Sequence, residues 1–197
     1  MTSSQIQTEP ALQTPAPPAS APPTLERLVL TGFMGAGKST IGRLLAARLG
    51  WNFLDLDAHL EERTGTTVPE IFAVHGEARF RRLESSALAS ALTRRSTVVA
   101  LGGGTPEGLT NRLLLEQTPA TLTVFLDAPF PTLFDRCVLQ DISRPVLADP
   151  DEARARFSLR RPLYLRLAKI AIDTSALSPE ETVQNLILVL NKLDLCL

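Results

Sequence analysis

Residues 32–40 read GFMGAGKST, and their order is more specific than a turn requires. The segment fits the pattern G-x-x-x-x-G-K-[ST]. Glycines let the backbone wrap closely around an anion and point its N–H groups inward, and a helix N-terminus adds partial positive charge. The lysine can reach phosphate oxygens, and the hydroxyl that follows can hold Mg²⁺. The stretch therefore predicts a loop that binds the phosphates of a nucleotide, with ATP as the best candidate.

The context of this loop supports the same reading. An apolar strand pattern precedes it and a helical pattern follows it, as the motif requires. The alternative, a glycine-rich turn with an accidental lysine, explains neither the full motif nor its context. The residues expected to contact ATP here are Gly35, Ala36, Gly37, Lys38, Ser39 and Thr40.

Two carboxylates follow in the segment LDLD, at the end of the next apolar run. If this run is extended, Asp55 and Asp57 point to the same face of the strand. The carboxyl ends of strands beside a phosphate loop are where α/β sheets bind ligands. One carboxylate could then support Mg²⁺ through water while the other accepts a hydrogen bond from a substrate hydroxyl. The alternative is an ordinary strand-to-helix turn with Asp57 as the N-cap.

Two more segments carry patterns that could belong to a site. In GEARFRRLES (76–85), Arg81 and Glu84 would share one face of a helix. A solvated charged face is the plain alternative for this run. In LGGGTPEG (101–108), the glycines Gly102–Gly104 follow a strand, so backbone can approach a ligand with no side chain between them. A simple loop is the alternative there.

The elements that must position these segments alternate between short apolar strands and longer helices. Strands are predicted over 27–33, 51–57, 121–129 and 169–173, and 96–104 is predicted to be a strand that runs into a glycine turn. Helices are predicted over 38–50, 58–64, 130–138, 151–168 and 178–193, with one or two more helices in 68–93. Ser178 is the expected N-cap of the last helix, with Pro179 at its first position. Pro162 lies inside the predicted helix 151–168 and is expected to kink or break it. This alternation predicts an α/β fold of three layers, α/β/α, around a parallel sheet.

Composition narrows the class of protein. Hydrophobic residues make up 44% and charged residues 21% of the 197-residue chain, as in ordinary globular proteins. The net charge of −1 gives no support to a nucleic-acid or membrane partner, and no apolar run approaches the roughly 20 residues of a membrane span. Cys137 and Cys196 lack metal-type spacing, which favours a reducing compartment and a cytoplasmic location. The charge and the size allow a monomer.

The N-terminal residues 1–24 differ from the rest of the chain. They are rich in Pro, Ala, Ser and Thr, and they contain no Lys or Arg. Such a composition buries too little apolar surface to offset its ordering entropy. We therefore expect a disordered tail over 1–24 and one folded domain over 25–197.

The segments GFMGAGKSTIGRLLA, LDLD, EARFRRLE, LGGG, SRPVL (143–147) and RRPLY (160–164) occur in this order, and with them the chain resembles the shikimate kinases over about residues 27–193. The set LDLD, FRRLE, GGG and R-x-P-L-Y is far more specific than the phosphate loop alone. The resemblance implies a P-loop fold like that of nucleoside monophosphate kinases, with five parallel strands in the order 2-3-1-4-5. It also implies transfer of the ATP γ-phosphoryl to the 3-hydroxyl of shikimate, in the pathway to aromatic amino acids, with Mg²⁺ as cofactor.

The resemblance also implies roles for single residues. Asp57 would hold the ring hydroxyls and accept the proton of the attacking one, and Asp55 would support Mg²⁺ next to Ser39. Arg81 and Arg160 would clamp the substrate carboxylate, which suits the planar fork of arginine. Glu84 would position Arg81. The backbone at three glycines would contact the substrate: Gly102, Gly103 and Gly104.

Further roles fall on the helix after the fourth strand and on a lid. The resemblance implies a mobile lid around 137–150 that carries Arg144 to the transferring phosphate, so that Arg144 joins Lys38 and Asp57 as a catalytic residue and also contacts ATP. Arg136 is expected to stack on the adenine. The chain departs from the family in having Cys137 where a basic residue is common, and it has no basic residue in 173–179. His59 and His75 are expected at the surface or its boundary.

Two other function classes fit part of these patterns. One is another small-molecule kinase of the same fold, such as a gluconate or nucleotide kinase, but the GGG and R-x-P-L-Y set argues against it. The other is a nucleotide-binding regulatory module that has lost catalysis. The intact set of Lys38, Ser39, Asp55 and Asp57 argues against that class.

Overall fold

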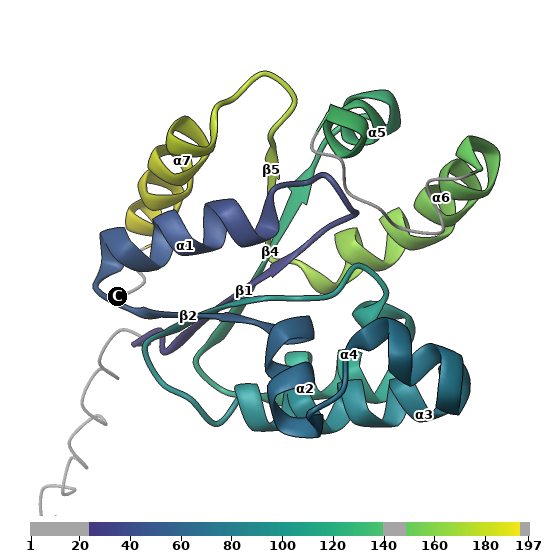
Figure 1. Ribbon diagram of the computed structural model, residues 1–197. Helices are drawn as coiled ribbons and strands as arrows, with labels where there is room; N and C mark the ends of the chain where they lie inside the picture. The colour runs from purple at the N-terminus through teal and green to yellow at the C-terminus, as the bar shows by residue number, and fades with distance from the viewer. Residues whose placement is uncertain (1–23, 140–148, 194–197) are drawn as a thin grey trace, which may run out of the picture.

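The computed structural model describes residues 24–139 and 149–193, and its centre is a parallel sheet of five strands (Figure 1). The strands lie in the order β2-β3-β1-β4-β5, which confirms the predicted order. Each neighbouring pair is parallel. The strands are β1 Arg27–Thr31, β2 Asn52–Asp55, β3 Thr97–Ala100, β4 Thr121–Asp127 and β5 Ile170–Asp173.

Helices cover both faces of this sheet. In Figure 1, α1 and α7 lie together on one side, and α2, α3 and α4 lie on the other. The predicted three-layer arrangement is therefore confirmed. The helices are α1 Lys38–Leu49, α2 Leu56–Thr64, α3 Val68–Ala91, η1 Thr105–Glu107 (a 3₁₀ turn), α4 Leu109–Gln117, α5 Phe130–Leu139, α6 Pro150–Leu167 and α7 Pro179–Lys192.

The central strand β1 shows why the sheet is buried on both faces. Its Leu28 and Leu30 belong to the same apolar cluster as Leu45 of α1 and Leu186 of α7. Val29, which points to the opposite face, belongs to a second cluster with residues of α3. A strand that is fully apolar on both faces is typical of a parallel sheet between helical layers. These two cores fix the carboxyl ends of the strands, where the site is built.

The second strand ends earlier than predicted. β2 stops at Asp55, whose carboxylate accepts hydrogen bonds from the N–H groups of Asp57 (3.2 Å) and Ala58 (3.5 Å). Asp55 is thus the N-cap of α2, and Asp57 lies in the first turn of that helix. The prediction that both carboxylates sit on one extended strand was wrong, and so was the alternative that Asp57 is the cap.

Other departures have local physical causes. α6 continues through Pro162 as one helix, so of the expected kink or break the break does not occur. Pro162 and Ser158 both lie on the exposed side of the helix, where the carbonyl that loses its partner can bind water. The 68–93 segment forms two helical parts joined at Gly76 (φ 71°, ψ 175°). The capping box at Ser178 is confirmed, with Pro179 following it.

The elements between 105 and 120 and the burial of His59 were not predicted. The turn η1 and helix α4 fill the part of the chain between 105 and 120 to which no element was assigned. His59 is buried rather than at the surface, because α2 packs against α3. No helix in the described ranges combines the length and the apolar character that a membrane span needs.

Candidate functional site

The glycine-rich loop joins β1 to α1 in a conformation that leaves the start of the helix open to an anion. Gly35 (φ 76°) and Gly37 (φ 82°) adopt left-handed backbone that other residues rarely take. Gly37 is the N-cap of α1 and brings no side chain to its N–H groups. Ala36 is buried beneath the loop, and Thr40 is exposed in the first turn of α1. The loop can therefore surround a phosphate with backbone donors.

Lys38 and Ser39 lie at this same helix start. The Lys38 Nζ donates to the carbonyl oxygens of Gly32 and Phe33, at 2.9 Å each, so the ammonium is held across the loop. The Ser39 hydroxyl donates to Asp55 Oδ2 at 2.6 Å. This bond links the first turn of α1 to the end of β2, and it places two oxygen ligands side by side.

The Ser39–Asp55 pair fits a magnesium ion that takes most of its ligands from elsewhere. Mg²⁺ favours oxygen ligands, and in nucleotide sites it keeps one or two protein oxygens together with phosphates and waters. Within the described residues, no group of three or more His, Cys, Asp or Glu side chains could hold a metal by itself. The donor set therefore suits a nucleotide-bound ion better than an all-protein cage.

The glycine run Gly102–Gly104 lies between the carboxylate of Asp57 and the arginines. A methyl group added at Gly102 would lie 2.9 Å from Asp57 Oδ1, and one at Gly104 would lie 2.9 Å from both terminal nitrogens of Arg81. A methyl group at Gly103 would lie 3.7 Å from the carbonyl oxygen of Gly32. The run therefore adjoins the phosphate loop as well. Backbone without side chains leaves room for a small ligand among these groups.

Arg81 extends from α3 toward the glycine run and is held by carboxylates. Its Nη1 donates to Glu84 Oε2 at 3.0 Å, and its Nη2 contacts Glu77 and Glu107 at 3.1 Å each. Burial lowers the pKa of Arg81, but the carboxylates, with Glu84 first among them, outweigh it and raise that pKa above its usual range. The guanidinium is therefore a fixed positive charge.

Glu84 is the buried member of this group, with 1% of its surface exposed. Its Oε1 accepts from the Thr105 hydroxyl at 2.7 Å, and its other oxygen accepts from Arg81. Burial raises the pKa of Glu84, against the opposing hydrogen bonds from Thr105 and Arg81. The two bonds fix the orientation of Glu84, and Glu84 in turn orients Arg81.

Arg160 reaches the same region from α6. Its Nε and Nη2 donate to the two carboxylate oxygens of Glu107, at 3.0 and 3.1 Å. Its Nη1 lies 3.8 Å from the methyl position at Gly103. The buried Tyr164, one turn further along α6, donates its hydroxyl hydrogen to the Gly103 carbonyl at 2.6 Å. α6 thus both supplies a cation and holds the glycine run in place.

Glu107 and Tyr164 are the residues of this site that the sequence patterns did not reveal. Tyr164 was part of the RRPLY motif but carried no assigned role. Glu107 follows the glycines directly in TPEG, and that position was the available signal. Its partners Arg81 and Arg160 lie 26 and 53 residues away, so no local periodicity pointed to the contact.

Of the residues expected near the adenine and the lid, the structure describes only some. Arg136 of α5 donates to the Thr174 hydroxyl (3.2 Å) and carbonyl (2.6 Å), in the loop after β5. This contact brings together the two segments expected near the adenine. Cys137 is buried, and its sulfur lies 3.0 Å from the methyl position at Gly35. Arg144, most of the expected lid, and Cys196 lie outside the described residues.

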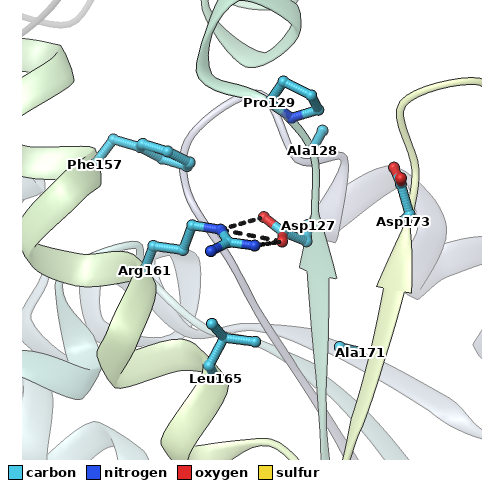
Figure 2. A pocket seen from close by; sticks show the side chains of 8 residues that line it. All are labelled: Asp127, Ala128, Pro129, Phe157, Arg161, Leu165, Ala171 and Asp173. Carbon is cyan, nitrogen blue, oxygen red and sulfur yellow. Dashed lines mark hydrogen bonds and ion pairs between the residues drawn. The ribbon is translucent and has the colours of Figure 1, made fainter.

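A pocket of about 610 Å³ lies between α6 and the ends of β4 and β5 (Figure 2). Arg161 points into it and pairs with Asp127, with Nη2 at 2.6 Å from Oδ2. Phe157 and Leu165 of α6 line the same side as Arg161. None of the lining residues is a predicted site residue, so the pocket does not coincide with the glycine run.

The fold and the geometry together define a class. A 2-3-1-4-5 parallel sheet with a phosphate loop after β1, facing a carboxylate and two arginines around a glycine run, is the architecture of a P-loop kinase for a small acceptor. A family model described as shikimate kinase matches residues 34–191. The chain belongs to the shikimate kinase family, whose members transfer phosphate from ATP to shikimate.

Individual relatives agree with this assignment. A shikimate kinase of Mycobacterium avium (strain 104) is 41% identical over 173 residues, which cover 86% of this chain and 96% of that protein. The structure of shikimate kinase from Acinetobacter baumannii in complex with shikimate has a TM-score of 0.79 at 36% identity, and covers 86% of this chain and 95% of that one. A gluconokinase from Sinorhizobium meliloti 1021, at 20% identity and a TM-score of 0.54, covers 87% of this chain and 93% of that one, and it shares the fold alone.

Proposed function

We propose that this chain transfers the γ-phosphoryl group of ATP to the 3-hydroxyl of shikimate, giving shikimate 3-phosphate and ADP. One observation carries the proposal: methyl positions on the glycine run lie within 4 Å of the phosphate loop, of Asp57 and of both arginines. Shikimate is a small ring with one carboxylate and several hydroxyls. It needs cations for the first and hydrogen-bond acceptors for the second, and this site offers both within reach of a bound phosphate.

Asp57 is the proposed proton acceptor. It lies in the first turn of α2 beside Gly102, whereas Arg81 lies beside Gly104 at the other end of the glycine run. A carboxylate there can hold the attacking hydroxyl and take its proton as the oxygen bonds to phosphorus. Arg81 and Arg160 hold the carboxylate of the acceptor and so fix the ring, while the glycine backbone at 102–104 lies along it. Positioning of this kind supplies much of the catalysis in phosphoryl transfer.

Lys38, the loop backbone and the Ser39–Asp55 pair act on the nucleotide. The N–H groups of Gly35, Ala36, Gly37 and the start of α1 would surround the phosphates, with Thr40 in the same turn. Lys38 would neutralise charge on the transferring group. Ser39 would hold Mg²⁺ directly and Asp55 through water, and the bound ion supplies charge that stabilises the phosphate oxygens. Arg144 is proposed to add a further cation from the lid, and Arg136 to contact the adenine.

The net charge and the cysteines bear on the partners and the compartment of the protein. The net charge of −1 supports neither a nucleic acid nor a membrane as partner, and the cysteine usage supports a reducing compartment. We therefore propose a cytoplasmic enzyme that acts as a monomer on small molecules.

A coupled ADP-release assay with MgATP tests the proposed reaction. Shikimate, gluconate, AMP and buffer without acceptor would be compared at equal concentrations. ADP release that depends on shikimate is the expected result. Equal rates with gluconate or AMP would refute the choice of acceptor, and ATP binding without acceptor-dependent turnover would favour a regulatory module.

A further inference from the structure

Glu107 pairs with both of the arginines that are proposed to hold the acceptor carboxylate. Its two oxygens lie 3.0 and 3.1 Å from Nε and Nη2 of Arg160, which is the two-pronged pairing that guanidinium makes with carboxylates. The second oxygen also accepts from Arg81 Nη2 at 3.1 Å. One carboxylate of the protein itself therefore bridges both arginines.

This contact leaves little of the arginine pair for a second carboxylate. The Nε–Nη2 edge of Arg160 is taken by Glu107, and Arg81 already contacts Glu77 and Glu84. An acceptor carboxylate at the same edge would meet Glu107 at close range, and two like charges there repel each other. An acceptor carboxylate can therefore take this edge of Arg160 only if Glu107 leaves it.

We propose that Glu107 is a positioning residue that holds the arginine pair in place of the substrate carboxylate, competes with that carboxylate and yields to it on binding. The inference rests on the proposed function, because it takes Arg81 and Arg160 as the carboxylate clamp. Glu107 keeps the two guanidinium groups oriented and neutralised while no acceptor is present. An acceptor can contact both arginines only if its own negative charge replaces that of Glu107.

The surroundings of Glu107 allow its side chain to leave without a change of backbone. The side chain is 39% exposed, so water can receive the carboxylate. The turn η1 is held from α4: Arg112 Nη1 donates to the carbonyls of Pro106 (2.6 Å) and Glu107 (2.9 Å). Asn111 donates to the Thr105 carbonyl at 2.9 Å. Rotation of one side chain therefore suffices to free the arginines.

Glu107 should weaken the binding of shikimate rather than strengthen it. Binding of shikimate must replace the charge-assisted hydrogen bonds of Glu107, which lowers the apparent affinity. An uncharged acceptor cannot displace Glu107 from the arginines, so the residue should leave the affinity for such an acceptor unchanged. A residue that merely kept the arginines folded would have the opposite effect, since its removal would weaken binding.

The test is calorimetric titration of shikimate into the full-length protein without nucleotide, together with the ADP-release assay. Glu107→Gln keeps the shape of the side chain but removes its charge, and should bind shikimate about three- to tenfold more tightly than the unmodified protein. KM for shikimate should fall in parallel, with KM for ATP unchanged. Shikimate methyl ester, which lacks the charge, should show no such gain.

Two further variants sharpen the test. Glu107→Asp keeps the charge but is too short to bridge both arginines, so it should also bind shikimate more tightly, and it serves if the glutamine variant folds poorly. Glu77→Gln removes a carboxylate from Arg81 but not from Arg160. Because Glu77 is two-thirds exposed, this control should change the affinity by no more than about twofold.

The outcomes separate this inference from the proposed function. Unchanged or weaker shikimate binding by both Glu107 variants, in a protein that still turns over shikimate, would overturn the inference alone. An equal gain with the methyl ester would also overturn it, because Glu107 would then act by bulk rather than by charge. Failure of the unmodified protein to bind or phosphorylate shikimate would overturn the proposed function and this inference together.

Discussion

Arg160 and Arg161 are adjacent in α6, but their guanidinium groups reach different parts of the molecule. Arg160 is 8% exposed and pairs with Glu107 beside the glycine run. Arg161 is exposed and pairs with Asp127 at the end of β4, inside the pocket of Figure 2. Successive residues on a helix point about 100° apart, so one step in the sequence moves the charge from the proposed acceptor site to another surface.

The first prediction separates these two arginines. Arg160→Ala should raise KM for shikimate by at least about tenfold, because it removes a cation proposed to hold the acceptor carboxylate. Arg161→Ala should change it by less than about threefold, since an exposed ion pair contributes little. Steady-state kinetics at saturating MgATP would measure both. A larger effect in Arg161→Ala would show that the assignment within RRPLY is wrong.

The second prediction concerns Asp57. Asp57→Asn keeps the size of the side chain but removes its ability to take a proton, so kcat should fall by about 10²- to 10⁴-fold. The affinity for ATP should stay near normal, because Asp57 lies beside Gly102 rather than in the phosphate loop. Turnover assays and nucleotide titration measure the two quantities separately. A large loss of ATP affinity would count against the assignment of Asp57 to the acceptor.

The third prediction concerns magnesium. Ser39→Ala removes the hydroxyl that lies 2.6 Å from Asp55 Oδ2, and with it the proposed direct ligand of the ion. The concentration of Mg²⁺ that gives half-maximal activity should therefore rise at fixed ATP. Ser158→Ala, which removes an exposed serine hydroxyl from α6, is the control and should leave this concentration unchanged. An unchanged magnesium dependence in Ser39→Ala would exclude Ser39 as a ligand.

Local patterns were enough to predict a parallel sheet between helical layers and several segments of the proposed site, whereas the order of the strands came from the resemblance. The phosphate loop, LDLD and the GGG run each lie at the carboxyl end of one strand, and in a parallel sheet those ends meet at one edge. Arg81 and Arg160 came from motif resemblance rather than from periodicity. The structure brings all of these segments to the glycine run, as a shared site requires.

The features that were not predicted depend on tertiary contacts, or on a choice between two local structures that the same residues allow. LDLD is compatible with a longer strand or with a cap at Asp55, and the two hydrogen bonds to α2 decide for the cap. The contact of Glu107 with two distant arginines has no sequence period. The burial of His59 depends on how α2 packs against α3, which the sequence of α2 alone does not reveal.

The fourth prediction follows from that buried histidine. His59 Nε2 lies 3.4 Å from Ser90 Oγ, and burial lowers the pKa of His59, with Arg94 and Arg63 acting in the same direction and Glu62 against them. The unfolded chain therefore binds this proton more readily than the folded one. Stability should fall as the pH drops below about 6.5 toward the lower folded-state pKa.

Replacement of the histidine tests this pH dependence. His59→Gln cannot take up the proton, so the loss of stability between about pH 7.5 and about pH 5.5 should be smaller than in the unmodified protein. Urea unfolding at the two pH values gives the comparison. His75→Gln, at an exposed position of α3, is the matched control. Equal slopes for His59→Gln and the unmodified protein would show that His59 does not account for the pH dependence.

The last prediction concerns the phosphate loop itself. A methyl group added at Gly35 would collide with the backbone carbonyl of Leu133 and lie 3.0 Å from the sulfur of Cys137. Gly35 also has a left-handed φ of 76°, which costs about 1–2 kcal/mol for other residues. Gly35→Ala should therefore lose at least this much stability and, because the loop must shift away from α5, most of its affinity for ATP as well.

A second glycine separates the collision from the backbone cost. Gly65 has a similar φ of 65°, but apart from its chain neighbours no atom of the described residues lies within 4 Å of its methyl position. Gly65→Ala should lose about the same 1–2 kcal/mol of stability in urea unfolding and keep its affinity for ATP. If the two variants bound ATP equally well, the packing of the loop against α5 would not be what sets the shape of the phosphate site.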